Sequence, residues 1–92
     1  MCVPTRPSQN DPERAQAWAA TREAVGRRIR DLRLERGVTQ EALALSADID
    51  RSLLIDLEKG RRSLLFERLY DLAAALDVPI TEIVRDGEAP RP

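Results

Sequence analysis

Histidine is absent from this sequence, and cysteine occurs only once, as Cys2. A disulfide framework within the chain and a zinc site of the Cys/His type are therefore both excluded. The sequence also offers no nucleophile beside a plausible base, no phosphate-cradling glycine loop and no cluster of metal ligands. We therefore predict a protein that is not an enzyme and that binds no cofactor.

Long apolar runs are missing as well. No stretch approaches the roughly 18 residues that a helix needs to cross a bilayer. The N-terminus has no basic segment followed by an apolar one, which is the pattern of a secretory signal. We therefore expect a protein with no membrane partner, located in the cytoplasm and associated with the nucleoid if its partner is DNA.

Aromatic residues are scarce, with one Trp, one Tyr and one Phe among 92 residues. A chain of this length is expected to form a single domain. Since Leu, Ile, Val and Ala must then fill its core, the composition suits packed helices better than a β-sandwich. The fold class predicted is all-α.

Charge is nearly balanced over the whole chain but not along it. The net charge of −1 argues by itself against a nucleic-acid partner. Residues 26–62, however, hold nine cations and seven anions, whereas residues 63–92 hold three cations and six anions. Any nonspecific binding to DNA should accordingly be weak and sensitive to salt.

Signals for helix ends and loops divide the chain into four parts. Asp11 followed by proline is typical of a helix start, and a helical pattern runs from there to about Arg36. Gly26 leaves two alternatives open for this stretch, one continuous helix or an extension bent against helix one. The parts expected are a disordered arm (1–10), an N-terminal helical extension (11–24), the main domain (25–86) and a flexible tail (87–92).

The most informative stretch is residues 37–62. Gly37 is expected to end the preceding helix as a left-handed C-cap, and Thr39 to cap the next one. A turn at 48–50 leads into a third helix, Arg51 to Glu58, for which Asp50 is the expected N-cap. Two short helices joined by a three-residue turn, with cations directly after them, are typical of a surface that places one helix against a nucleic acid.

Two further helices are predicted beyond this pair. The first runs from about Leu65 to Leu76, and a final short turn from Thr81 to Arg85. Asp77-Val78-Pro79 separates them. Short links between these helices indicate a five-helix bundle.

The sequence closely resembles the lambda/Cro/Xre family of helix-turn-helix regulators at Thr39-Gln40-Glu41-Ala42-Leu43-Ala44 and at Leu54-Ile55-Asp56-Leu57-Glu58-Lys59-Gly60. The similarity extends over roughly residues 25–85. It implies a lambda-repressor-like five-helix bundle that binds double-stranded DNA as a homodimer at an inverted repeat and regulates transcription, for example as a repressor. Controller proteins of restriction–modification systems and several antitoxins share this size and fold.

The resemblance also implies roles for individual residues. Arg51 would reach base edges, where a guanidinium can bond bidentately to guanine. Asp56 would accept from a cytosine amino group, orient Arg51 or face water, and these alternatives stay open. The base-readout residues implied are Arg51, Ser52, Ile55 and Asp56; the phosphate contacts are Gln40, Lys59, Arg61 and Arg62; and a structural ion pair joins Arg33 to Glu58.

Two other interpretations remain open from the residues. Arg27, Arg28 and Arg30 form either a basic face toward the DNA backbone or an ordinary solvated helix face. The rival function is a protein-binding module of the same fold, antitoxin-like or polymerase-interacting, favoured by the acidic C-terminal third and by the acids near the reading face. Dimerisation is expected to use spare apolar surface at Trp18, Ile80, Ile83 and Val84.

Overall fold

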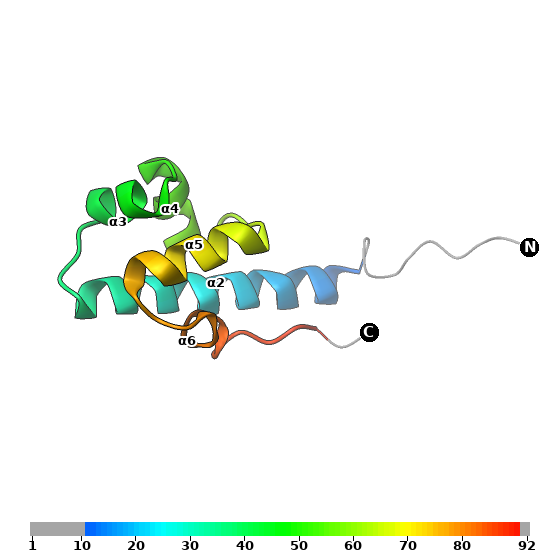
Figure 1. Ribbon diagram of the computed structural model, residues 1–92. Coiled ribbons are helices and arrows are strands. Elements are labelled where there is room, and N and C mark those ends of the chain that lie inside the picture. Colours follow the sequence, from blue (N-terminus) through cyan, green and yellow to red (C-terminus); the bar gives the residue numbers. More distant parts are fainter. Residues whose placement is uncertain (1–10, 91–92) are drawn as a thin grey trace, which may run out of the picture.

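The computed structural model describes residues 11–90 and consists of helices and loops in that range. The arm expected at residues 1–10 and the last two residues of the expected tail lie outside the described residues. The absence of strands from the described range confirms the all-α class. The helices are α2 (Pro12–Glu35), α3 (Gln40–Ala47), α4 (Arg51–Glu58), α5 (Phe66–Leu76) and α6 (Ile80–Val84) (Figure 1).

Helix α2 is continuous, which decides between the two alternatives left open at Gly26. It begins where the sequence predicts, because the Asp11 side chain accepts a hydrogen bond from the Glu13 backbone N–H at 3.0 Å. Gly26 does not interrupt the helix. A Cβ atom there would collide with the carbonyl oxygen of Leu57 and lie 3.0 Å from that of Glu58, so the glycine allows the end of α4 to pack directly on α2.

The core is aliphatic, as the composition predicts. Helix α2 packs on α4 and α6, α3 packs on α4 and α5, and α5 packs on α6. In Figure 1, α2 runs across the lower part of the molecule, with α3 and α4 together above it, α5 between them and α6 below α2. The largest fully buried side chains are Ile29, Leu43, Leu54, Leu72, Leu76 and Ile83.

The last helix corrects one expectation. It spans Ile80–Val84, one residue earlier than expected at each end, and Ile83 is fully buried in the core. The expectation that Ile83 offers spare surface for a dimer is therefore wrong. A five-residue helix has only one inward position per turn, and α6 uses it against α2 and α5.

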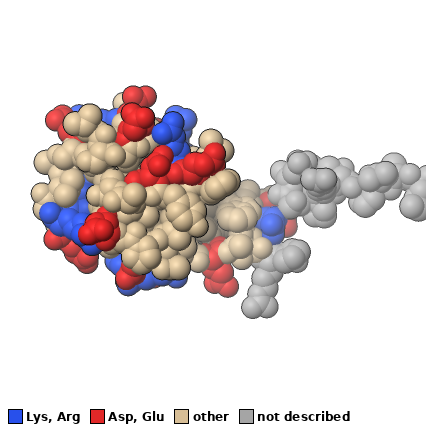
Figure 2. All heavy atoms as spheres, viewed as in Figure 1, with Lys and Arg blue, Asp and Glu red and all other residues tan. Residues whose placement is uncertain are grey.

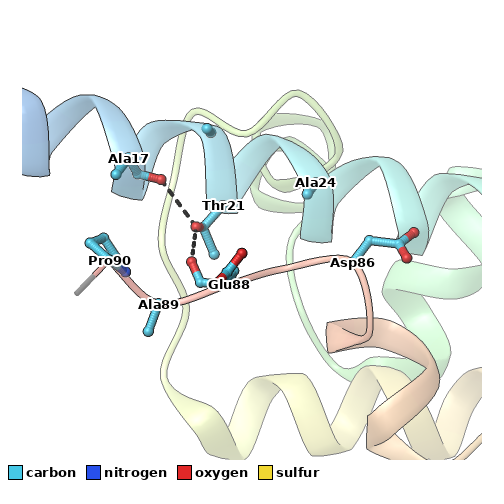
Figure 3. Close-up of a pocket in the computed structure, with 8 residues that line it drawn as sticks. Ala17, Thr21, Ala24, Asp86, Glu88, Ala89 and Pro90 are labelled. Atoms are coloured by element: carbon cyan, nitrogen blue, oxygen red, sulfur yellow. Dashed lines mark hydrogen bonds between the residues drawn. The ribbon is translucent and has the colours of Figure 1, made fainter.

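The chain after α6 returns along the N-terminal half of α2. Figure 3 shows residues 86–90 beside a row of small side chains on that helix. The Thr21 hydroxyl lies within hydrogen-bonding distance of the carbonyl oxygens of Ala17 and Glu88, and Arg14 Nη1 donates to the Pro90 carbonyl at 3.2 Å. Residues 87–90 of the segment expected to be a flexible tail thus lie against α2.

Candidate nucleic-acid interface

The turn between α3 and α4 lies where the sequence predicts it. Asp48 adopts the left-handed conformation at φ 56° and ψ 47°, which aspartate tolerates better than most residues. The Ile49 backbone N–H donates to the Ala44 carbonyl at 3.0 Å, which closes the end of α3. These contacts fix the direction in which α4 leaves α3.

The two helix starts differ in their capping. The Thr39 hydroxyl accepts a hydrogen bond from the Ala42 backbone N–H at 3.0 Å, which confirms the predicted cap of α3. Asp50 occupies the N-cap position of α4 with extended backbone, but its side chain makes no capping hydrogen bond. The prediction for Asp50 is therefore right in position and wrong in the bond it assigns.

Helix α4 has one buried face and one open face. Leu54 and Leu57 are buried in the core, as their spacing predicts. At the N-terminal end of the helix two polar side chains are exposed, and one turn later two more residues are partly exposed. These open positions are the ones implied for base readout: Arg51, Ser52, Ile55 and Asp56.

A buried ion pair holds α4 to α2. Arg33 Nε donates to Glu58 Oε2 at 2.7 Å and Arg33 Nη2 donates to Glu58 Oε1 at 3.1 Å, so the pair is bidentate. Arg33 Nη1 also donates to the Val38 carbonyl at 3.0 Å. Both side chains are almost fully buried. The last turn of α4 is thereby tied to α2 and to the loop that precedes α3.

The structure adds Gln40 to this network, a contact that sequence reasoning missed. Gln40 Nε2 donates to Glu58 Oε1 at 3.1 Å. The two residues lie eighteen positions apart, so no local pattern indicated that they meet. An amide nitrogen has two N–H donors, and one of them is left for a ligand such as a phosphate. Gln40 therefore bonds to the buried ion pair and also lies at the start of α3, where the resemblance implies that it contacts a phosphate.

The segment after α4 presents its cations to solvent in a fixed conformation. Lys59, Arg61 and Arg62 are exposed. Gly60 lies between them at φ 73°, and a Cβ atom there would come within 2.7 Å of the Glu23 Cα atom. The Arg61 backbone N–H donates to the Asp56 carbonyl at 2.9 Å. The loop is thus held close to α2 while its charged side chains point outward.

A shallow depression of about 510 Å³ joins the start of α3 to the start of α4. Gln40 and Arg51 line it together with Arg30 from α2, so the structure brings these three side chains to one place. Arg28 lies elsewhere: it is buried, its Nε donates to the Glu82 carbonyl at 2.8 Å, and it pairs with the Glu82 carboxylate. The basic face left open for α2 therefore does not include Arg28.

Residues 11–90 contain neither a candidate metal site nor a candidate membrane-spanning helix. No group of three or more His, Cys, Asp or Glu side chains there is placed to hold a metal ion. Within the same range, no helix has the length and apolar character needed to span a membrane.

Comparison with known proteins gives one family match. A family model described as "Helix-turn-helix" matches residues 29–83, which includes α3, the turn, α4 and α5. Among solved structures, the restriction-modification controller protein C.AhdI from Aeromonas hydrophila superimposes with a TM-score of 0.69 at 36% identity, covering 70% of this chain and 97% of that one.

Two relatives extend this result. The cryptic phage CTXphi transcriptional repressor RstR of Vibrio cholerae is 39% identical over 61 residues, which are 66% of this chain and 55% of that protein. An uncharacterized HTH-type transcriptional regulator of Sinorhizobium fredii, y4dJ, is 40% identical over 63 residues, covering 68% of this chain and 82% of the regulator. The match thus spans about half the length of RstR and most of the other two proteins.

Proposed function

Because the chain belongs to the lambda/Cro/Xre family of helix-turn-helix DNA-binding transcriptional regulators, we propose that it binds an inverted-repeat operator as a homodimer. The observation that carries the proposal is the open face of α4, held at a fixed angle by the Arg33–Glu58 pair. Such a protein acts where the DNA is, on the nucleoid in the cytoplasm, and regulates transcription without enzymatic activity.

Base readout is assigned to the exposed start of α4. The N-terminal residues of a recognition helix reach deepest into the major groove. Arg51 is exposed there and can donate two hydrogen bonds to guanine N7 and O6, while Ser52 is small enough to bond to more than one base edge. One turn further on, Ile55 would contact a thymine methyl group and Asp56 would accept from a cytosine amino group.

Phosphate contacts are assigned to the two sides of this helix. Gln40 lies in the depression at the start of α3, beside Arg30 and Arg51, where the helix N-terminus also favours an anion. Lys59, Arg61 and Arg62 follow α4 and hold the backbone on the other side. These contacts fix the register of the protein on the duplex and carry little sequence information.

Symmetry then determines the operator. Two α4 helices that enter successive major grooves on one face of B-DNA lie about 34 Å apart. Since the two subunits are identical and related by a two-fold axis, each reads the same half-site in opposite orientation. The operator is therefore an inverted repeat with its half-sites one helical turn apart.

The experiment that tests the proposal is selection of bound sequences from a random duplex pool at two salt concentrations. We expect recovery of an inverted repeat with affinity that falls as salt rises. Recovery of a single half-site would contradict the dimer but keep the DNA-binding function. Recovery of nothing beyond weak nonspecific binding would contradict both and favour the rival function, a fold whose main partner is a protein.

A further inference from the structure

All three aromatic residues of this chain lie at the surface. Trp18 is 39% exposed, Phe66 69% and Tyr70 57%, so none of them fills the core. Leu65, next to Phe66, is 69% exposed as well. At about 150–250 Å² for each aromatic side chain, the three together expose on the order of 300 Å². We call these four residues the aromatic patch.

An apolar groove lies against this patch. It has a volume of about 330 Å³ and runs between the middle of α2, from Trp18 to Ile29, and the segment that leads into α5. Trp18 and Val25 line it on α2, and Leu64 and Leu69 line it on the other side. Leu69 follows Phe66 by three positions on α5, which places the two side chains on neighbouring parts of one helix surface. Phe66 therefore projects next to the wall of the groove that Leu69 forms.

Charges of opposite sign flank this surface. Arg22 lines the groove, and Glu67 is exposed next to Phe66 at the start of α5. Neither side chain takes part in an ion pair with another residue of the described range, although other surface carboxylates do. Arg62 also lines the groove and has no ion-pair partner among residues 11–90. The groove thus carries two cations, and the projecting residues carry one anion, without an ion-pair partner in that range.

We propose that this surface is the dimer interface, with Phe66 of each copy seated in the groove of the other and Glu67 facing Arg22. A two-fold interface uses the same patch on both subunits and must be complementary to itself. A surface that holds both a groove and a projecting aromatic side chain, with a cation beside one and an anion beside the other, meets that requirement.

Two further observations favour a second copy as the occupant. Interface centres are enriched in aromatic residues and surrounded by a polar rim, and a standard interface buries about 800 Å² on each partner. An apolar centre of the size of the aromatic patch fits that area. A small ligand would fill the groove but leave Leu65, Phe66 and Tyr70 in water, whereas a second copy covers the groove and these side chains at once.

This inference deepens the proposed function, because it rests on the homodimer and names the surface that forms it. The segment to which phosphate contacts are assigned, with Lys59, Arg61 and Arg62, ends two positions before Leu64. A two-fold axis at the aromatic patch therefore brings the two phosphate-contacting segments next to the axis, one from each subunit.

The first test is sedimentation of the full chain over a range of micromolar concentrations. We expect the wild type to be dimeric and Phe66→Glu to dissociate, with the dimer weakened on the order of tenfold or more. Because Phe66 is exposed, the helical circular dichroism spectrum should be unchanged. Leu34→Glu is the matched control: Leu34 is 53% exposed on α2 and lies about 24 Å along the helix from Trp18. This variant should dimerise like the wild type.

The second test uses charge reversal and the single tryptophan. Arg22→Glu and Glu67→Arg should each weaken the dimer, and the double variant should recover it. Absence of recovery would overturn the assigned pairing. Trp18 emission should shift to longer wavelength as the wild type is diluted and dissociates.

The outcomes separate this inference from the proposed function. A dimer that tolerates Phe66→Glu would overturn the inference and leave the homodimer standing. A monomeric wild type at tens of micromolar would overturn both. A monomer whose Trp18 emission responds to an apolar dye such as anilinonaphthalene sulfonate would also overturn the inference and assign the groove to a small apolar ligand. DNA selection remains an independent test, since a monomer can still read a half-site.

Discussion

Glu58 connects the three helices that carry the candidate interface. Its carboxylate accepts hydrogen bonds from Arg33 on α2 and from Gln40 on α3 while its backbone belongs to α4. Three helices thus meet at one buried side chain. Because the carboxylate is buried, its hydrogen bonds offset the free-energy cost of taking the Arg33 guanidinium and the Gln40 amide out of water.

Glu58→Ala should lower the free energy of unfolding by about 3–5 kcal/mol, since it leaves the Arg33 guanidinium buried without its counter-charge. Urea denaturation followed by circular dichroism measures this change. Asp71→Ala is the matched control, because the Arg68–Asp71 pair is about half exposed, with 3.8 Å between the charged atoms. Such pairs contribute about 0–1 kcal/mol. Equal effects of the two substitutions would contradict the buried role of Glu58.

Arg51→Ala should reduce the affinity for the selected operator by about 1–3 kcal/mol and relax base preference at one position of each half-site. Fluorescence anisotropy with the operator and with single-base variants measures both effects. Arg85→Ala, another exposed arginine that pairs with Glu82 and Asp86, should leave the affinity unchanged. If operator binding survives Arg51→Ala, the readout role proposed for Arg51 is wrong.

At the scale of helices, the close crossing of α2 and α4 sets the position of α4. The crossing depends on Gly26, whose missing side chain leaves room for the carbonyl groups at the end of α4. The Arg33–Glu58 pair lies about two turns further along α2 and holds the same two helices. A glycine in a helix interior costs stability relative to alanine, and here the packing offsets that cost.

Gly26→Ala should destabilise the protein, by about 1–3 kcal/mol or more, because the new methyl group collides with backbone atoms that cannot rotate away. Thermal or urea unfolding measures the loss. Ala74→Gly, at an exposed position of α5, should cost only about 0.5–1 kcal/mol. A stabilising effect of Gly26→Ala, as expected for an open helix position, would show that α4 does not approach α2 this closely.

The two capping positions make a matched pair for a second prediction at this scale. Thr39→Ala removes a hydrogen bond to the Ala42 backbone N–H and should cost about 1 kcal/mol. Asp50→Ala removes no capping bond from α4 and should cost clearly less. The comparison requires only the unfolding free energies of the two variants. A larger loss for Asp50→Ala would mean that its side chain caps α4 in solution.

For the molecule as a whole, charge limits how strongly DNA can be held without sequence recognition. Figure 2 shows Lys/Arg and Asp/Glu side chains interspersed on the face turned toward the viewer, with no large area of one sign. The net charge is −1. We therefore expect attraction to DNA to depend on the few cations around α4 and not on the overall field of the protein.

Substituting Lys59, Arg61 or Arg62 with alanine should weaken binding to all sequences about equally. Each substitution should reduce the slope of log affinity against log salt by about 0.9 for every DNA phosphate that is no longer neutralised. Operator and random duplex titrations at several salt concentrations measure the slopes. Arg85→Ala again serves as the control and should leave the slope unchanged. A variant that loses sequence preference but keeps its slope would indicate that the substituted side chain binds a base.

The sequence by itself determined where the helices lie along the chain. It also determined that α3 and α4 form a helix-turn-helix motif. Asp11, Thr39 and Gly37 act on backbone groups within a few residues, so their effects can be predicted from local order. The aliphatic spacing predicted Leu54 and Leu57 in the core for the same reason. The helix-turn-helix motif is itself a local pattern.

Only the tertiary structure decided which side chains on these helices contact one another and which stay exposed. Gln40 bonds to Glu58 across eighteen residues, and Gly26 serves a crossing with α4 where the sequence allowed a bend. Ile83 is buried although it was expected to be free, and the aromatic side chains lie outside the core. These outcomes depend on which helix faces meet. The energy of such contacts is set by packing between distant segments, which no local signal encodes.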